Sequence, residues 1–483
     1  MQLFHTKSCR ISWVQLAVIV IFTCVMGYSS YQTLRDPDTY LHLAAGKWII
    51  SHQQLPQTDP FSYVMQGSEW LTHEWLSEIF LSLIYQYGGW SALVILAALC
   101  LAVTTGIELR FLFNRVPAIY ALSFSALTFF SLVTHLSVRP HILVWPLIGI
   151  WFAKILETSE QNKAPPYWLL LLMLCWANLH GSFILGFVLL IPIAIEATLK
   201  QPHLLFAWSR FGLLAVMTSM ITPLGLKGWL FSFQLMNLQA LTSISEWAAS
   251  DFTALNPIEL WLVILLAYGL LGKLRLEPLR LILLLLVLHQ ALAHGRYISL
   301  FGLLTPMLIA SSLQASQRHT NQQSKAENLL DHWFSRLSFK GSPLGTGMTI
   351  LLLIFTGLFF THYKSYYPDH TITPQKAVAA IKQSQIKGNV LNFYNFGGYL
   401  IDQGIPVFVD GRADLYGDPH LKTYMEGTQS NHPEKIQKLL NDFNIAWTIF
   451  PPGSALNLYL EGSEHWKLFY QDAIATVYVR SAN

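Results

Sequence analysis

The segment that decides the fold is RDPDTYLHLAAGKWIISHQQLPQTDPFSYVMQGSEWLTHEWLSE, residues 35–78, because it is polar yet lies between two long apolar runs. It is also rich in tryptophan, tyrosine and leucine, which is typical of a loop that lies along a membrane surface as amphipathic helices. Asp38 and His42 would share one face of such a helix. The segment carries Asp36, Asp38, His42, Asp59, Glu69, His73, Glu74 and Glu78.

Apolar runs on both sides of this segment predict about eleven membrane spans. The first run, at about 13–28, follows Lys7 and Arg10 and precedes no small-residue cleavage site, so it predicts an uncleaved anchor. The further runs approach the roughly 20 residues that cross a bilayer. They lie at about 91–112, 117–135, 141–157, 167–180, 181–199, 208–224, 257–272, 279–294, 297–313 and 346–363.

The composition predicts a polytopic α-helical membrane protein. Of 483 residues, 53% are apolar and only 12% are charged, and the mean hydropathy is +0.40. These values exclude soluble, disordered and collagen-like chains and outer-membrane barrels. A net charge of +3 with scattered basic residues gives no sign of a nucleic-acid partner. The four cysteines have no spacing typical of a metal site or a disulfide framework.

Lysine and arginine predict the orientation, because positive residues near span ends stay in the cytoplasm. With the N-terminus inside and the C-terminal segment left aside, fifteen of them lie in cytoplasmic segments and five in the opposite loops, namely Arg35, Lys47, Arg139, Lys227 and Arg296. We therefore expect a multi-pass protein of the inner (plasma) membrane with loop 31–78 outside. Residues 167–199 are either one long helix or two spans that meet at His180–Gly181, and Lys163 and Lys200 favour two.

The segment 364–483 has ten basic and eleven acidic residues and no run long enough to span. It predicts a small extracytoplasmic α/β domain behind a membrane domain at 1–363. Expected strands lie at 390–394, 406–410, 446–450 and 473–479, with a helix at 433–443 capped by Asn431. The loop 314–345 reads as cytoplasmic and partly disordered, with an amphipathic stretch near 329–337.

The other outer joints add further polar residues at a similar predicted depth. Charged groups near hydrocarbon normally face a bundle interior or a wet cavity. We therefore expect one cavity at the outer leaflet that holds an anionic ligand, with or without a metal. The added residues are Arg139 and His141 (SVRPH), Asn178 and His180 (WANLHGSF), Glu246 and Asp251 (SEWAASDF), and His294 and Arg296 (HGRY).

Structural alternatives exist for several of these residues. Arg139 and Arg296 could anchor to lipid phosphate, and His180 could cap a helix end. Asp59 could only start a turn before Pro60. The glutamates that read as solvated are Glu69, Glu78 and Glu259. For the flanking carboxylates of Asp36-Pro37-Asp38 the sequence shows no packing need.

A second polar cluster lies in FGGYLIDQGIPVFVDGRADLYGD, residues 396–418 of the C-terminal segment. Asp410 and Arg412 could form a strand-end turn locked by an internal ion pair. The alternative is a ligand or acceptor site that includes Asp410, Arg412 and Asp414.

A cytoplasmic N-terminus, one span and a long outer loop that begins with an acidic element resemble the GT-C superfamily of lipid-linked-sugar glycosyltransferases. The matching text is Asp36-Pro37-Asp38-Thr39-Tyr40-Leu41-His42 followed by Pro56-x-x-Asp59-Pro60-Phe61, within residues 11–363. The whole pattern, with HEWL, RPH, LHGSF, SEW and DGRADLY, is similar to a group of uncharacterised bacterial membrane proteins usually placed beside that superfamily. The chain has no WWDYG signature and no clear second acidic pair in its second outer loop.

The resemblance implies inverting transfer of a sugar from a polyprenyl-phosphate-linked donor to an acceptor hydroxyl on the extracytoplasmic side. Asp36, with Asp38 as the alternate, would be the general base or a metal ligand. A divalent metal, if used, would involve Asp36, Asp38 and His73. The donor phosphate would be bound by Arg139, His141, His180 and Arg296, with support from His42, Asp59, His73, Glu74, Glu246 and Asp251. The alternative class is a non-catalytic transporter or scaffold for envelope polysaccharide or lipid assembly.

Overall fold

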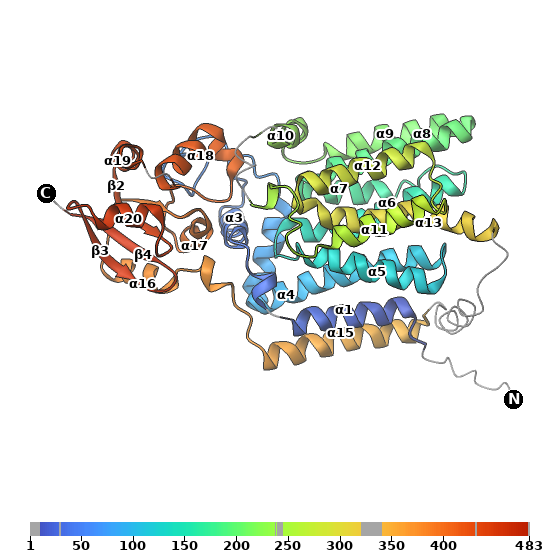
Figure 1. The fold of residues 1–483 in the computed structure, drawn as a ribbon, viewed down its shortest axis with the longest axis horizontal. Helices are drawn as coiled ribbons and strands as arrows, with labels where there is room; N and C mark the ends of the chain where they lie inside the picture. The colour runs from blue at the N-terminus through green and yellow to red at the C-terminus, as the bar shows by residue number, and fades with distance from the viewer. Residues whose placement is uncertain are drawn as a thin grey trace.

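The computed structural model describes residues 10–28, 30–236, 238, 245–319, 341–429 and 432–481. Its larger part is a bundle of helices that run side by side (Figure 1). The bundle helices are α1 (Trp13–Gly27), α4 (Trp75–Phe113), α5 (Ala118–Val133), α6 (Pro140–Glu160), α7 (Leu169–Leu179), α8 (Ile184–Lys200), α9 (Leu205–Ser219), α11 (Pro257–Leu270), α12 (Pro278–Ala293), α13 (Ile298–His319) and α15 (Pro343–Tyr363).

Every predicted apolar run falls on one of these helices. Within the described residues, five segments are long and apolar enough to cross a membrane by length and composition: Trp75–Phe113, Pro140–Glu160, Gly181–Lys200, Gly295–Leu313 and Pro343–Tyr363. The total of about eleven spans, the orientation and the domain boundary at 363 stay predictions. The loop predicted at 314–345 lies largely outside the described residues, including its amphipathic stretch.

Local sequence explains where several bundle helices begin and end. Pro140 opens α6 after an extended Arg139, because a residue before proline is pushed out of the helical region. Asn256 and Glu259 form a capping box that starts α11, so Glu259 is a helix cap and not a free solvated carboxylate. The break favoured at His180–Gly181 is present, since His180 is extended (φ −161°) between α7 and α8.

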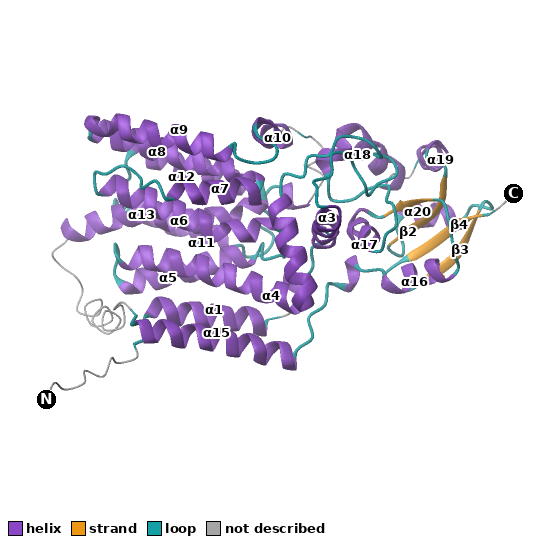
Figure 2. Cartoon of the chain, turned by 180° about the vertical axis from the view of Figure 1, so that it is seen from behind, coloured by secondary structure: helices purple, strands orange, loops and turns teal. Residues whose placement is uncertain are grey.

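The C-terminal part contains a four-stranded sheet in the order β1-β2-β4-β3. β1 (Asn389–Asn392) is parallel to β2 (Ile445–Phe450), whereas β4 (Thr476–Arg480) is antiparallel to β2 and to β3 (Trp466–Gln471). Figure 2 shows helices around this sheet, namely α16 (Gln375–Gln383), α17 (Gly397–Asp402), α18 (Ala413–Gln429), α19 (Pro433–Asp442) and α20 (Ala455–Glu461).

Two details of this part differ from the sequence prediction. Residues 406–410 are not a strand, because their backbone binds a side chain and a loop: Asn392 Oδ1 accepts from the Phe408 N–H at 2.9 Å, and the Val407 N–H donates to the Phe61 carbonyl at 3.2 Å. The strand β3 was not predicted. The helix at 433–443 is present with His432 at its N-cap position, while the expected cap Asn431 lies outside the described residues.

Between the bundle and the sheet lies α3 (Asp38–His52), which crosses the bundle axis (Figure 1). It packs closely against α4 because Gly46 has no side chain: a Cβ at Gly46 would overlap the Glu78 carbonyl oxygen. The other short helices outside the bundle are α2 (Ser30–Thr33) and α10 (Leu226–Met236). The segment 35–78 therefore lies between the helix bundle and the sheet domain.

Candidate active site

Asp36 starts helix α3 as well as facing the site. Its Oδ1 accepts from the Asp38 N–H at 3.0 Å, which satisfies a backbone donor at the helix start. Its Oδ2 accepts from the Ser137 hydroxyl and from Arg139 Nη1, each at 3.2 Å. Asp36 thus has the structural role that the sequence did not show, and both of its oxygens are already bound by protein donors.

Arg139, just before α6, is the centre of the acidic cluster. Its guanidinium contacts Asp36 at 3.2 Å, Asp38 at 3.0 Å and Glu246 at 3.1 Å. Burial alone would lower the pKa of Arg139, but Asp36, Glu246 and Asp38 raise it well above its ordinary value. The arginine therefore points into the cluster and is permanently charged, which is not the geometry of a lipid-phosphate anchor.

Asp38 is the more accessible of the two flanking carboxylates. Its side chain is 15% exposed against 6% for Asp36. Its Oδ2 binds Arg139. Burial raises the pKa of Asp38 to about 6, opposed by Arg139 and assisted by Asp36. A carboxylate whose pKa lies near neutrality is suited to accept a proton at physiological pH.

The Glu74 carboxylate lies close to three histidine side chains. The Glu74 carboxylate lies 3.2 Å from His180 Nε2, 3.7 Å from His73 Nε2 and 3.8 Å from His42 Nε2. Burial would raise the pKa of Glu74, but these histidines and Arg139 lower it to about 2. Glu74 therefore stays ionised throughout the physiological range.

His180 is held between α7 and α8 in one defined tautomer. Its Nδ1 accepts from the Ser182 N–H at 2.9 Å, so the ring proton is on Nε2 and points at Glu74. The predicted role as a helix-end cap is therefore present together with its place in the cluster. Ser77 Oγ donates to the Leu179 carbonyl at 2.6 Å, which fixes this joint against α4.

Glu78 is buried, which corrects the prediction that it is solvated. The residue is only 4% exposed, and its Oε1 lies 3.5 Å from His42 Nδ1. Burial would lower the pKa of His42, but the contact with Glu78 and the charge of Glu74 raise it overall. Glu69 behaves as predicted: it is exposed and paired with Lys227 at the surface.

Arg296 stands apart from the other arginines. Its guanidinium lies over the Trp247 ring, 4.4 Å from the centroid. No described carboxylate is within ion-pair distance of it. The pKa of Glu246 is lowered to about 2, mainly by the charge of Arg139, against the effect of burial, and further by the charge of Arg296. Arg296 therefore lies near the acidic cluster. A half-buried guanidinium without a carboxylate partner is free to bind an anion.

The predicted residues that remain take different places. His141 Nε2 donates to the His135 carbonyl at 3.0 Å. The charges of Arg139 and His180 are close enough to act electrostatically on the His141 ring, so His141 lies at the cluster. Asp251 is exposed and its carboxylate accepts from the Thr253 N–H at 2.8 Å. The structure therefore gives Asp251 a turn and no contact with the cluster.

Asp59 belongs to a different contact, between the first loop and the sheet domain. Its oxygens accept from the Phe61 and Ser62 N–H groups, as expected for a turn before Pro60. Its Oδ1 also lies 2.7 Å from Arg412 Nη1. Arg412 completes the internal ion pair that the sequence suggested, with Asp410 at 2.7 Å.

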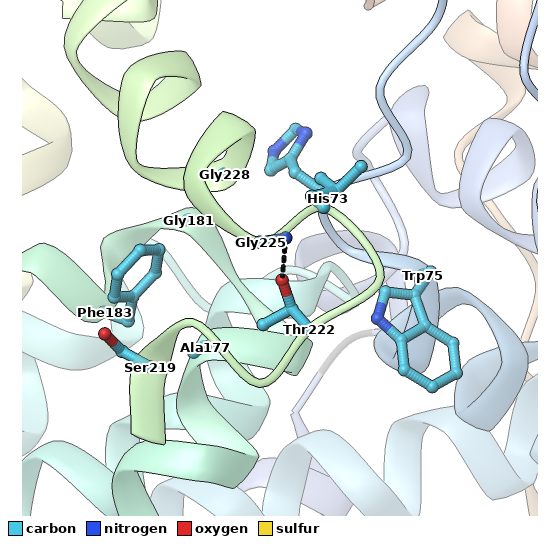
Figure 3. Close-up of a pocket in the computed structure, with 10 residues that line it drawn as sticks. His73, Trp75, Ala177, Gly181, Phe183, Ser219, Thr222, Gly225 and Gly228 are labelled. Carbon is cyan, nitrogen blue, oxygen red and sulfur yellow. Dashed lines mark hydrogen bonds between the residues drawn. The ribbon is translucent and has the colours of Figure 1, made fainter. Parts of the chain in front are cut away.

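The third candidate of the C-terminal domain, Asp414, faces the histidine side of the site. Burial raises the pKa of Asp414 against the field of His73. His73 packs on Phe231 of α10 and lines a narrow cleft with Trp75 and Thr222 (Figure 3). The cleft lies between α10, which contributes Gly228, and the joint of α7 and α8, which contributes Gly181.

These contacts do not fit the metal site that remained open from the sequence. Asp36 and Asp38 bind Arg139, whereas His73 faces Glu74. Among the described residues, no group of three or more histidine, cysteine or acidic side chains is arranged to hold a metal ion. We therefore assign no step to a metal.

Sequence reasoning missed three residues that the structure places at the cluster. Ser137 binds Asp36, Trp247 supports Arg296, and Gly411 lies against Asp38, since a Cβ there would overlap Asp38 Oδ1. Each of them is one or two residues from a candidate, in SVRPH, SEW and DGRADLY. Proximity to those motifs was the only signal available.

Comparison with solved structures finds this fold in the oligosaccharyltransferase of Archaeoglobus fulgidus in its apo form. The superposition has a TM-score of 0.51 and 10% sequence identity and covers 93% of this chain and 70% of the other. At that identity the likeness concerns the fold alone. No family model and no curated protein sequence matches the chain.

Proposed function

We propose that this protein is a membrane glycosyltransferase that moves a sugar from a polyprenyl-phosphate-linked donor to an acceptor hydroxyl on the extracytoplasmic side, with inversion. The observation that carries the proposal is the acidic pair bound to Arg139 near Arg296, which has no ion pair among the described residues. A proton acceptor and a free cation at one end of a GT-C-type bundle supply the two groups that such a transfer needs.

Asp38 is the better candidate for the base, in place of Asp36. Asp36 accepts three hydrogen bonds from protein donors, whereas Asp38 is more exposed and has a pKa raised to about 6 by burial. Asp38 would take the acceptor's hydroxyl proton while the oxygen attacks the anomeric carbon. The bond from that carbon to the phosphate oxygen breaks, and the phosphate keeps the electron pair.

Arg296 is the group best placed to offset the charge on the departing phosphate. It carries no ion pair among the described residues, so a phosphate can bind without displacing a carboxylate. Arg139 has a different role, because the three carboxylates around it outnumber its single charge. We assign Arg139 to holding the acidic pair in place.

The lipid tail of the donor would remain in the bilayer while the phosphate reaches the site. His73 and Trp75, the two sequence neighbours of Glu74, both line the narrow cleft (Figure 3). The neighbouring helix α10 exposes Leu226, Leu230 and Phe233, which lie on one helix face by their spacing. Such a face suits contact with lipid at the level of the membrane surface.

The deciding experiment measures sugar release from polyprenyl-phosphate-sugar donors in reconstituted membranes, with the wild type and Asp38→Asn. Transfer by the wild type that falls in the variant supports the proposal. No transfer by the wild type with any such donor contradicts it and favours the transporter or scaffold. A reporter fused after Asn483 that is active only in the cytoplasm would contradict the extracytoplasmic assignment.

A further inference from the structure

The sheet domain reaches the acidic pair through one tight turn, Asp410–Arg412. Gly411 of this turn lies so close to Asp38 that a Cβ on the glycine would overlap the carboxylate. Tyr394, from the same domain, is also near enough for the charge of Asp38 to act on it. The Oδ1 side of Asp38 therefore packs against the C-terminal domain, while the side chain remains 15% exposed.

Arg412 fixes this turn to the first loop. Its guanidinium binds Asp410 through Nε at 2.8 Å and Nη2 at 2.7 Å, and Asp59 through Nη1 at 2.7 Å. The Tyr416 hydroxyl donates to Asp410 at 2.7 Å. Arg412 is 5% exposed and Asp59 is 3% exposed. A buried arginine with two carboxylates in this geometry holds its partners in one orientation.

The Arg412 contact is remote from the reacting groups in sequence but adjacent to them in space. Asp59 is in the first loop, 353 positions before Arg412, and Gly411 is the residue directly before Arg412. The Arg412 guanidinium also lies over the ring of Trp70 in the loop, with 4.7 Å between Arg412 Cζ and the ring centroid. Releasing Arg412 would thus allow the turn to move away from Asp38.

We propose that Arg412 is a positioning residue that, through its ion pair with Asp59, holds Gly411 against Asp38 and limits the access of water to the carboxylate. The inference rests on the proposed function, because it assigns the C-terminal domain a part in preparing the base. A side chain at position 411 would overlap the Asp38 carboxylate, so the present contact between the turn and Asp38 requires glycine. Arg412 itself touches no reacting group.

For Arg412→Gln, the change expected in the pKa of Asp38 is opposite in sign to the effect of removing the charge alone. Burial is the largest cause of the raised pKa of Asp38, so water admitted by a loosened turn lowers that pKa. Deleting a positive charge would instead raise it. The other charged groups that face Asp38 are Asp36, His42, Arg139 and Glu246, and all of them remain in the variants below.

The test measures the protonation of Asp38 directly, without any sugar transfer. Dicyclohexylcarbodiimide modifies protonated carboxyls, so labelling of Asp38 across pH, located by peptide mass spectrometry, gives its midpoint. The variants are Arg412→Gln, Asp59→Asn and Gly411→Ala in the full-length protein. Gly462→Ala is the matched control, because a Cβ there meets only the Tyr459 carbonyl at 3.9 Å.

We expect a wild-type midpoint near pH 6 and a decrease of about one unit in the three variants, with Gly462→Ala unchanged. Gly411→Ala changes no charge, so it preserves the test if Arg412→Gln does not fold. An unchanged or higher midpoint in the folded variants would overturn the proposal. Absence of transfer in the wild type would contradict the proposed function and leave this measurement intact.

Discussion

The two ends of the helix bundle both contain a buried arginine, but they satisfy it differently. At the end that faces the sheet domain, Arg139 contacts Asp36, Asp38 and Glu246 with no second cation in the group of contacts. At the opposite end, Arg280 contacts Glu196 at 2.9 Å and Glu160 at 3.4 Å. The second arginine belongs to a larger network, and its partners have further cations.

We call this opposite group the far network: Arg115, Glu160, Glu196, Lys200, Glu277 and Arg280. Arg115 pairs with Glu160 at 2.7 Å, and Lys200 pairs with Glu196 at 3.0 Å and Glu277 at 2.7 Å. Its three cations thus match its three carboxylates. A balanced, mutually paired set leaves no charge for a ligand and ties helices α6, α8 and α12 together.

The site end is unbalanced in two ways. Three carboxylates share one guanidinium, and Arg296 nearby has no ion pair among the described residues. Unpaired charge near a membrane is costly and is retained mainly where a ligand or substrate uses it. We therefore propose that the far network stabilises the fold and that the site end serves the proposed transfer. Each of the following predictions tests this division.

The largest effect on stability is expected from Arg280→Met. Removing one partner of a buried ion pair leaves a carboxylate without compensation and costs about 3–5 kcal/mol. We expect a lower melting temperature in detergent and unchanged transfer for each folded molecule. Arg280→Lys, which keeps the charge, should lose less. Lost transfer with unchanged melting would mean that the far network also serves the reaction.

The next effect is expected from Asp38→Asn, which removes the basic oxygen and keeps the shape of the side chain. Transfer should fall by about 10²-fold or more. Transfer by Asp36→Asn should fall less, because the asparagine oxygen can still accept the hydrogen bond from the Asp38 N–H. If Asp36→Asn loses more than Asp38→Asn with both proteins folded, the base is Asp36. If neither loses transfer, the acidic pair has no part in the mechanism.

A smaller effect is expected from pH alone. With the pKa of Asp38 at about 6, transfer should fall about tenfold per unit below that pH, because the base becomes protonated. Because its pKa is raised, Asp38 in the folded state keeps its proton at pH values where an ordinary aspartic acid has lost it. Its contribution to the free energy of unfolding is therefore complete at low pH and is lost as the pH rises through about 6. Profiles of transfer and of melting against pH check both signs, and Asp38→Asn should remove the change in melting.

The smallest effect is expected from Glu277→Gln, at the rim of the far network. Lys200 and Glu277 are 47% and 50% exposed, and exposed pairs contribute about 0–1 kcal/mol. We expect a melting temperature close to that of the wild type, and an even smaller difference between the two proteins at high salt. The matched buried variant, Glu196→Gln, should cost clearly more. Equal losses in the two variants would show that burial does not divide this network as described.

Much of the bundle was predictable because helix boundaries depend on local chemistry. Apolar runs, proline at 140 and the break at His180–Gly181 act over a few residues, and the structure contains the corresponding helices. The gathering of candidate residues at one end also followed from their shared position at helix joints. Glu78 was mispredicted because its burial depends on the fit of α3 against α4 at Gly46, which no local pattern shows.

The sequence by itself determined that the chain is helical, apolar enough for a membrane, and polar at the joints of its helices. Only the tertiary structure decided which joints meet. Arg139 joins carboxylates from two separate segments, 36–38 and the one that holds Glu246, and Asp59 contacts Arg412 across 353 positions. Residues 406–410 follow the same rule, since they pair with Asn392 and loop 61–63 instead of a strand. The reason is physical: helix formation is governed by neighbours in sequence, whereas an ion pair or a close glycine contact depends on packing between segments that the sequence lists far apart.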